Sequence, residues 1–163
     1  MFKKRLELIF ISIIILAISI LAKNYYDSYT YKHNDISQNY KQLIADKEQE
    51  VLDLMQQHYG IRLDIPLIVT DEFKGRLYGL SSYKDGRIKI YLNKKVMQES
   101  MDYILESVIS HEYAHALMFQ QGYLHSGKKG HSPRWQQTCV NLGGINCGQY
   151  VNSNDVVMGK MPF

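Results

Sequence analysis

Proline is scarce in this chain of 163 residues, with 3 copies, and glycine, with 11, is not enriched, so the composition does not indicate disorder. A strong charge of either sign is also missing. The formal net charge is +3, whereas a nucleic-acid-binding domain usually carries a stripe or cluster of Lys and Arg. We therefore do not expect nucleic acid as a partner. Apolar residues make up 45% of the chain and charged residues 21%, which is ordinary for one small globular domain.

The N-terminus carries one long apolar run. Residues 8–22 are interrupted only by Ser12 and Ser19, and a basic stretch, residues 3–5, precedes them. Counted from Leu6 the stretch has 17 residues and, at about 1.5 Å each, spans roughly 26 Å, just short of a typical hydrocarbon core. A continuous apolar run with basic residues before it is typical of a membrane segment. We therefore predict a transmembrane helix at this end of the chain.

A cleaved signal peptide is the alternative to a membrane anchor. Cleavage requires small residues, and Ile20-Leu21-Ala22 has a bulky first member. We therefore favour an uncleaved anchor over residues 1–22, a linker over 23–34 and a folded domain over 35–163. Because positive residues stay inside, we expect a cytoplasmic N-terminus and a domain outside the cytoplasm, at the cell membrane. Four tyrosines that follow the run suit the headgroup region: Tyr25, Tyr26, Tyr29 and Tyr31.

Turn signals divide the first part of the domain into one helix and three strands. Asp35 can cap an amphipathic helix that ends at Gly60. Residues 65–70 predict a short buried strand, and residues 77–83 and 87–93 flank an Asp-Gly pair, which is a strong hairpin signal. We expect these strands to form a small antiparallel sheet.

The next helix carries a metal-binding pattern. Ser100 is a plausible N-cap for it, and Gly122 supplies a left-handed stop. Within it, His111 and His115 are four residues apart, so both imidazoles lie on one helix face and can reach one metal ion. Glu112 lies beside them. The alternative, surface histidines on an ordinary helix, fits poorly because the surrounding residues are apolar.

A third ligand must lie elsewhere, because a catalytic zinc site usually has three protein ligands and one open position. Glutamate is missing from residues 116–163, where Asp155 is the only acidic residue, so a downstream glutamate ligand is excluded. His125 and His131 remain as candidates. Ser132-Pro133 predicts the start of a short helix, which would hold His131 in place, whereas glycines surround His125 in a predicted loop. We prefer His131 and interpret His125 as an exposed loop histidine.

These motifs, in this order, resemble the SprT-like zinc metalloprotease family. The resemblance rests on a strand that ends near Asn93, the HExxH helix over residues 111–117, and Gly-His-x-x-x-Trp over residues 130–135. It covers residues 35–143. It implies a zinc metalloendopeptidase with one catalytic zinc ion, and it implies that the second motif supplies the third ligand, which supports His131.

The chain also departs from that family. Ser132 stands where the family usually has a second glycine. Only Cys139 and Cys147 are present, so the zinc ribbon of some members is missing. If the domain is exported, these two cysteines can form a disulfide. The family's DNA-linked members act inside cells, whereas the apolar N-terminus favours a domain outside the cytoplasm, so the resemblance transfers chemistry and not substrate.

The sequence thus predicts an α+β domain, with a small antiparallel sheet packed on the metal helix and flanking helices, and one N-terminal transmembrane helix. We expect a membrane-anchored peptidase in which Glu112 is the general base and a protein or peptide substrate lies along a sheet edge. Tyr123 and His125 are candidate donors to the developing oxyanion. Two alternatives stay open: a zinc-bound interaction module without turnover, and a cytosolic DNA-associated protease.

Overall fold

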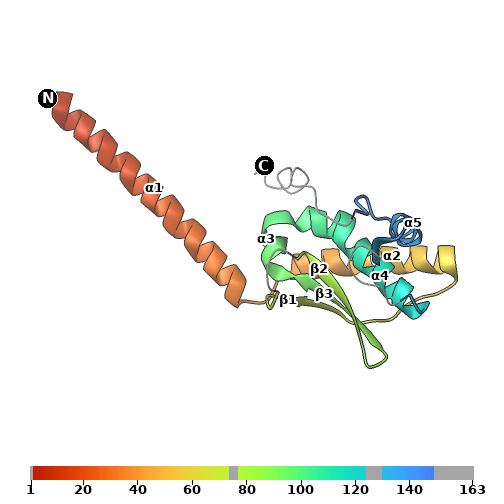
Figure 1. The fold of residues 1–163 in the computed structure, drawn as a ribbon. Helices are drawn as coiled ribbons and strands as arrows, with labels where there is room; N and C mark the ends of the chain where they lie inside the picture. Colours follow the sequence, from red (N-terminus) through yellow and green to blue (C-terminus); the bar gives the residue numbers. More distant parts are fainter. Residues whose placement is uncertain (1, 74–76, 124–129, 149–163) are drawn as a thin grey trace. The chain divides into compact units, whose positions relative to one another are not determined.

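The computed structural model describes residues 2–73, 77–123 and 130–148 of the chain (Figure 1). It divides the chain into two compact units, Met1–Ile36 and Ser37–Phe163. His125, one of the two candidates for the third ligand, lies outside the described residues.

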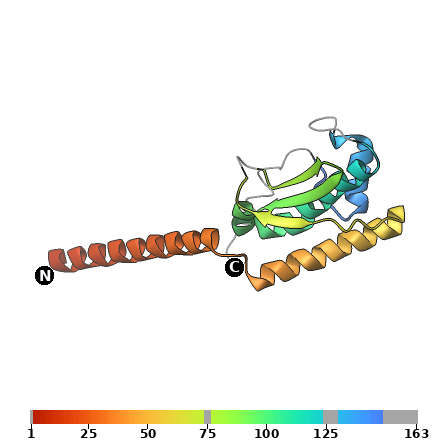
Figure 2. The ribbon, with the colours of Figure 1, turned by 90° about the horizontal axis from the view of Figure 1, so that it is seen from below.

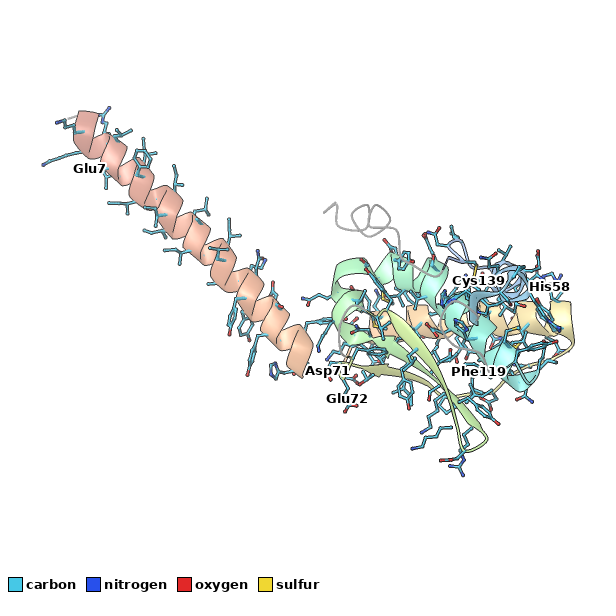
Figure 3. The ribbon with its side chains drawn as sticks, in the orientation of Figure 1. Glu7, His58, Asp71, Glu72, Phe119 and Cys139 are labelled. Carbon is cyan, nitrogen blue, oxygen red and sulfur yellow. A yellow bond between two sulfur atoms is a disulfide. The ribbon has the colours of Figure 1, made fainter. Side chains whose placement is uncertain are left out.

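The first unit is one long helix, α1 (Phe2–His33). Figure 3 shows the side chains of α1 projecting from the helix, and its large apolar side chains are exposed. The stretch Lys3–Tyr31 is long and apolar enough to cross a membrane, a property that an N-terminal signal sequence shares. Residues 23–33, which we expected to be a linker, continue the same helix.

The second unit begins with α2 (Gln38–Tyr59). Its N-cap is Ser37 and not Asp35, so the predicted cap was wrong by two residues. The Ser37 hydroxyl accepts a hydrogen bond from the Tyr40 N–H at 3.2 Å, whereas the Asp35 carboxylate accepts one from the N–H of Ile36 just before the helix. The predicted end is confirmed, because Gly60 has a φ of 66° and its N–H donates to the Gln56 carbonyl.

The three strands form one sheet in the order β1-β3-β2: β1 (Leu67–Thr70), β2 (Gly79–Lys84) and β3 (Arg87–Asn93). Strands β2 and β3 form the predicted antiparallel hairpin, whose turn residues Asp85 and Gly86 both have positive φ. Strand β1 pairs with β3 in parallel, so the prediction of a purely antiparallel sheet was wrong. The Asp-Gly signal is local to the hairpin. It carries no information on the direction in which β1, from an earlier part of the chain, pairs with β3.

The metal helix has an earlier start than the sequence indicated. Helix α3 (Lys94–Tyr103) is capped by Asn93, and a π-helical segment η1 (Ile104–Val108) joins it to α4 (Ile109–Gln120). Ser100 is not an N-cap but a buried kink inside α3, with φ −155° and ψ 54°. Asn93 outcompetes it as a cap because its carboxamide oxygen accepts the Lys95 N–H at 3.0 Å where β3 ends. Gly122, with a φ of 85°, follows the end of α4 as predicted.

Helix α5 (Pro133–Asn141) begins where the Ser-Pro pair predicts. The Ser132 hydroxyl accepts a hydrogen bond from the Trp135 N–H, and Pro133 occupies the first helical position. Cys139, labelled in Figure 3, forms a disulfide with Cys147. This bond ties α5 to the turn that follows it.

Helix α4 lies at the centre of the unit. It packs against β2 and β3, and also against α2 and α5, and Figure 2 shows the sheet and α2 on different sides of it. Eight of its 12 residues are buried. The residues that form its predicted metal pattern are therefore held in the most enclosed helix of this unit.

The disulfide should contribute measurably to stability. Closing a loop of this length restricts the unfolded chain, so replacing both cysteines, Cys139→Ser with Cys147→Ser, should lower the free energy of unfolding by about 2–3 kcal/mol. Urea unfolding of the detergent-solubilised full chain, followed by the fluorescence of its single tryptophan, measures this loss. Reductant should lower the unfolding midpoint of the unmodified chain and leave that of the double variant unchanged. If reductant does not change the unfolding midpoint of the unmodified chain, the disulfide does not contribute to its stability.

Candidate metal centre

Three histidine side chains meet at one place between α4 and α5. His111 and His115 leave α4 one turn apart, and His131 directly precedes the N-cap of α5. The Nε2 atom of His131 lies 3.3 Å from Nε2 of His111 and 3.2 Å from Nε2 of His115. All three candidate ligand atoms lie within 4.8 Å of one another. The structure thus brings together the three residues that we predicted as metal ligands.

The two spacings from His131, 3.2 and 3.3 Å, fit a tetrahedral metal ion. Zn–N distances of about 2.0–2.1 Å in a tetrahedron place neighbouring ligand atoms about 3.3–3.4 Å apart. Nitrogen lone pairs that converge so closely repel one another unless a proton or a cation lies between them. The donor set, three imidazoles with no thiolate or carboxylate, is one that zinc accepts in catalytic sites.

His111 and His115 are also in the protonation state that a metal requires. Burial lowers the pKa of His111 to about 4, with a further contribution from the charge of His131. Burial likewise lowers the pKa of His115 to about 3, and the charges of His111 and His131 act in the same direction. At neutral pH both rings are therefore neutral, with lone pairs available to a cation.

Trp135 supports all three rings from one side. Its ring centroid lies 4.6 Å from that of His111, 4.8 Å from His115 and 4.4 Å from His131. The indole is fully buried and stacks on His115 with an interplanar angle of 27°. The Gly-His-x-x-x-Trp motif contains Trp135, but we missed this role from the sequence. The Gly-His-x-x-x-Trp spacing was the available signal, because it sets the ring one helical turn after His131.

Glu112 contacts strand β2 and is only 6% exposed. The Ser81 hydroxyl lies 2.8 Å from Oε2 of Glu112 and 2.6 Å from its main-chain oxygen. A side chain at Gly79 would not fit, because a Cβ atom there would lie 2.8 Å from Cγ and from Oε1 of Glu112. Strand β2 therefore both makes room for this carboxyl group and binds it.

Burial raises the pKa of Glu112 to about 7, and hydrogen bonds from Ser81 partly oppose that shift. A carboxyl group with a pKa near neutrality can both accept and release a proton at physiological pH. A bound cation nearby would favour the ionised form, since an opposite charge lowers the pKa of an acid. Sequence reasoning identified Glu112 but missed Gly79 and Ser81, because nothing local to β2 says which of its faces meets α4.

Tyr123, one of the two predicted oxyanion donors, is engaged elsewhere. Its hydroxyl accepts a hydrogen bond from Nη1 of Arg134 at 2.5 Å, and the guanidinium also lies 4.6 Å from the centre of its ring. The other candidate, His125, is not among the described residues. The oxyanion donor therefore stays a prediction.

A comparison with protein families agrees with the geometry. A sequence model of the SprT-like family matches residues 28–155, which include both motifs of the candidate metal centre. No curated protein and no solved structure gave a significant match. On the strength of a match over most of its length, the chain belongs to the SprT-like family.

Proposed function

We propose that this protein is a zinc-dependent metalloendopeptidase of the HExxH type. The observation that carries the proposal is the convergence of His111, His115 and His131 beside Glu112, a buried carboxyl group on the same helix. Membership of the SprT-like family supports the same chemistry. A metal site with three protein ligands and an adjacent carboxyl group has the composition of a hydrolytic centre, whereas structural zinc sites are usually closed by a fourth protein ligand.

The three imidazoles would hold the ion, and zinc there would lower the pKa of a bound water toward about 7 and polarise the scissile carbonyl. Glu112 then accepts the proton of the attacking water and passes it to the nitrogen of the leaving amine. The hydrogen bond from Ser81 holds Oε2, and Oε1 lies against Gly79, where the missing side chain leaves space. Strand β2 thus keeps the carboxyl group in one orientation throughout the reaction.

The substrate is proposed to bind as an extended strand along β2. In the order β1-β3-β2, one side of β2 has no strand beside it among the described residues. The Asn93 N–H donates to the Tyr78 carbonyl, so antiparallel alternation turns the main-chain groups of Gly79, Ser81 and Tyr83 away from β3. These groups lie on the edge that passes Glu112. Main-chain hydrogen bonds at this edge would bring a peptide bond alongside the carboxyl group.

The first test of this function concerns the metal. Removing the third ligand with His131→Ala should weaken zinc binding by at least about 100-fold, since even residues that only support a ligand contribute about 10–100-fold. His115→Ala should have an effect at least as large. Zinc titration of the metal-free full chain, followed by the fluorescence of Trp135 against the ligand rings, gives the affinity, and elemental analysis gives the stoichiometry.

Two matched histidine variants serve as controls for the metal test. His125→Ala and His58→Ala remove the same side chain elsewhere and should leave zinc binding within about threefold of the unmodified chain, since the sequence predicts His125 as an exposed loop histidine and His58 lies at the end of α2, outside the three-histidine cluster. A larger loss in His125→Ala than in His131→Ala would show that the third ligand is assigned wrongly. Full zinc content in His115→Ala would remove the proposed site altogether.

The second test separates a peptidase from a zinc-bound module without turnover. Glu112→Gln keeps the size and hydrogen bonding of the side chain but cannot accept a proton, so cleavage of an unfolded protein should fall by at least about 100-fold while zinc content stays normal. The matched control is Glu106→Gln, the same substitution at an exposed position of η1, which should cleave at the normal rate. Undiminished cleavage by Glu112→Gln would remove this residue from the mechanism.

We further propose that α1 anchors the protein in the cell membrane, with its N-terminus in the cytoplasm and the peptidase domain outside. The support is the length and exposed apolar surface of α1, the basic residues at its start, and the Cys139–Cys147 disulfide. Disulfides persist in oxidising compartments and are rare in the cytosol. Basic residues at one end of a span stay on the cytoplasmic side.

A reporter enzyme that is active only in the cytosol, fused after Phe163, tests this topology. The fusion should be inactive and should sediment with membranes. Deleting residues 1–22 from the same fusion should restore reporter activity and release it into the soluble fraction. Activity of the full-length fusion would overturn the proposed orientation.

A further inference from the structure

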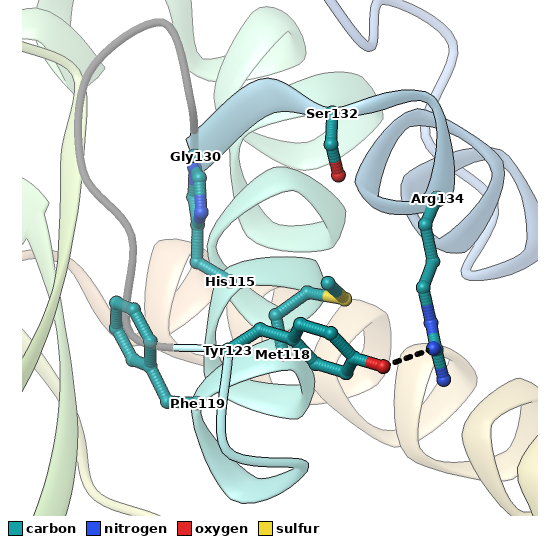
Figure 4. Close-up of a pocket in the computed structure, with 7 residues that line it drawn as sticks. All are labelled: His115, Met118, Phe119, Tyr123, Gly130, Ser132 and Arg134. Carbon is teal, nitrogen blue, oxygen red and sulfur yellow. Dashed lines mark hydrogen bonds between the residues drawn. The ribbon is translucent and has the colours of Figure 1, made fainter.

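A cavity of about 220 Å³ opens directly beside the metal centre (Figure 4). Its wall includes His115, so anything that fills it lies next to a proposed metal ligand. The remaining lining comes from the end of α4 and the start of α5: Met118, Phe119, Tyr123, Gly130, Ser132 and Arg134. Binding sites for whole small molecules usually enclose about 300–1,000 Å³. This cavity therefore has the size for one side chain and not for a free ligand.

Most of the cavity wall is apolar. Met118 is buried, and the rings of Phe119 and Tyr123 form further parts of the lining. Figure 4 shows these side chains grouped on the side of the cavity opposite Ser132 and Gly130. A large apolar side chain would gain from leaving water here, whereas a charged side chain would lose its hydration.

One cation lies on this wall. Arg134 is exposed, and it is held over the Tyr123 ring by the hydrogen bond to Tyr123 and a second one to Gln121 at 3.0 Å. No ion pair joins its guanidinium to a carboxylate within the part of the chain that the structure describes. Its positive charge therefore remains uncompensated there, and it opposes the entry of a lysine or arginine side chain.

The cavity is also connected to the strand along which we place the substrate. The Phe119 ring lies 6.3 Å from the His115 ring on one side and 6.2 Å from the Tyr83 ring of β2 on the other. A peptide paired with the edge of β2 would therefore pass Phe119 close to the metal ligands. One of its side chains near the scissile bond would face the cavity.

From these observations we infer that the cavity is a specificity subsite, which takes one large uncharged apolar side chain, such as Leu, Met or Phe, beside the scissile bond of a peptide substrate and rejects Lys and Arg. The inference rests on the proposed peptidase function and names its substrate class. The shared wall at His115, the apolar lining, the single-side-chain volume and the positive charge of Arg134 all select the same occupant.

Binding to an inactive form of the enzyme tests the subsite separately from catalysis. The zinc-loaded full chain with Glu112→Gln is mixed, in detergent, with labelled Gly/Ser peptides that carry one variable residue: Leu, Phe, Ala or Lys. Fluorescence anisotropy should show that the Leu and Phe peptides bind at least about tenfold more tightly than the Ala peptide, which follows from the apolar area removed from water. The Lys peptide should bind no better than the Ala peptide.

Substitutions in the lining separate the cavity from nonspecific binding to detergent, which all variants share. Phe119→Ser removes an apolar wall and should reduce the advantage of Leu over Ala by at least about threefold. Arg134→Glu should improve Lys binding by about threefold, the scale of one partly exposed charge pair. Arg87→Glu makes the same charge change on the β2–β3 hairpin, outside the cavity lining, and should alter neither preference.

Each outcome bears on a different claim. The subsite would be overturned if all peptides bind equally. It would also be overturned if Phe119→Ser does not reduce the preference for Leu and Arg134→Glu does not change the affinity for Lys. Neither result would contradict the peptidase function. The expected binding preferences would support the subsite. If the unmodified chain nevertheless cleaves none of these peptides and no unfolded protein, the peptidase function would be overturned. Preferred binding together with cleavage beside Leu or Phe would support both.

Discussion

The burial of α4 is the constraint on which the rest of the structure depends. A helix enclosed by a sheet and two other helices cannot leave its polar groups without partners, because each unpaired buried group costs about 1–3 kcal/mol. Most polar groups of α4 find partners outside the helix: Glu112 with Ser81, Tyr113 with Glu48, and Ser110 with the main-chain oxygen of Leu142. His111 and His115 remain, and both meet His131 over the indole of Trp135. The candidate metal centre is thus the place where the two imidazoles of α4 find their polar partner.

Strand β2 combines two roles because it is an edge strand that also packs on α4. Its inward side holds the general base proposed above, through the empty space at Gly79 and the hydroxyl of Ser81. Its outer edge, which has no strand beside it in the part of the chain that the structure describes, is the proposed substrate platform, and the Tyr83–Phe119 contact links that edge to the cavity beside His115. In this arrangement one short strand would contact both the substrate and Glu112 and so fix the position of one relative to the other. A rigid relation between the two favours reaction, since a displacement of about 1 Å can cost about 100-fold in rate.

Local signals in the sequence predicted much of this architecture. The Asp85-Gly86 turn, the Ser132-Pro133 cap and the i, i+4 histidines each depend on neighbours within a few residues, and all three appear as expected. Features that depend on distant segments were missed. The parallel pairing of β1 and the contact of Ser81 with Glu112 join residues whose relation no short pattern records. The start of the metal helix was misplaced because Ser100 and Asn93 are both good caps, and tertiary packing chose between them.

The π-helical segment between α3 and α4 has a consequence for how this chain can change. A π turn accommodates about one residue more than an α turn, so η1 shifts the phase of everything after it relative to α3. Each residue of an α-helix turns the chain by about 100°. A single deletion in the α-helical residues just before His111 would therefore swing His111 and Glu112 by about 100°, away from His131 and Ser81 respectively, whereas a single deletion within Ile104–Val108 would convert the π turn to an α turn and leave both facing as they do. The π segment is therefore a place where this helix can lose one residue and still present the same side of α4 to His131 and Ser81.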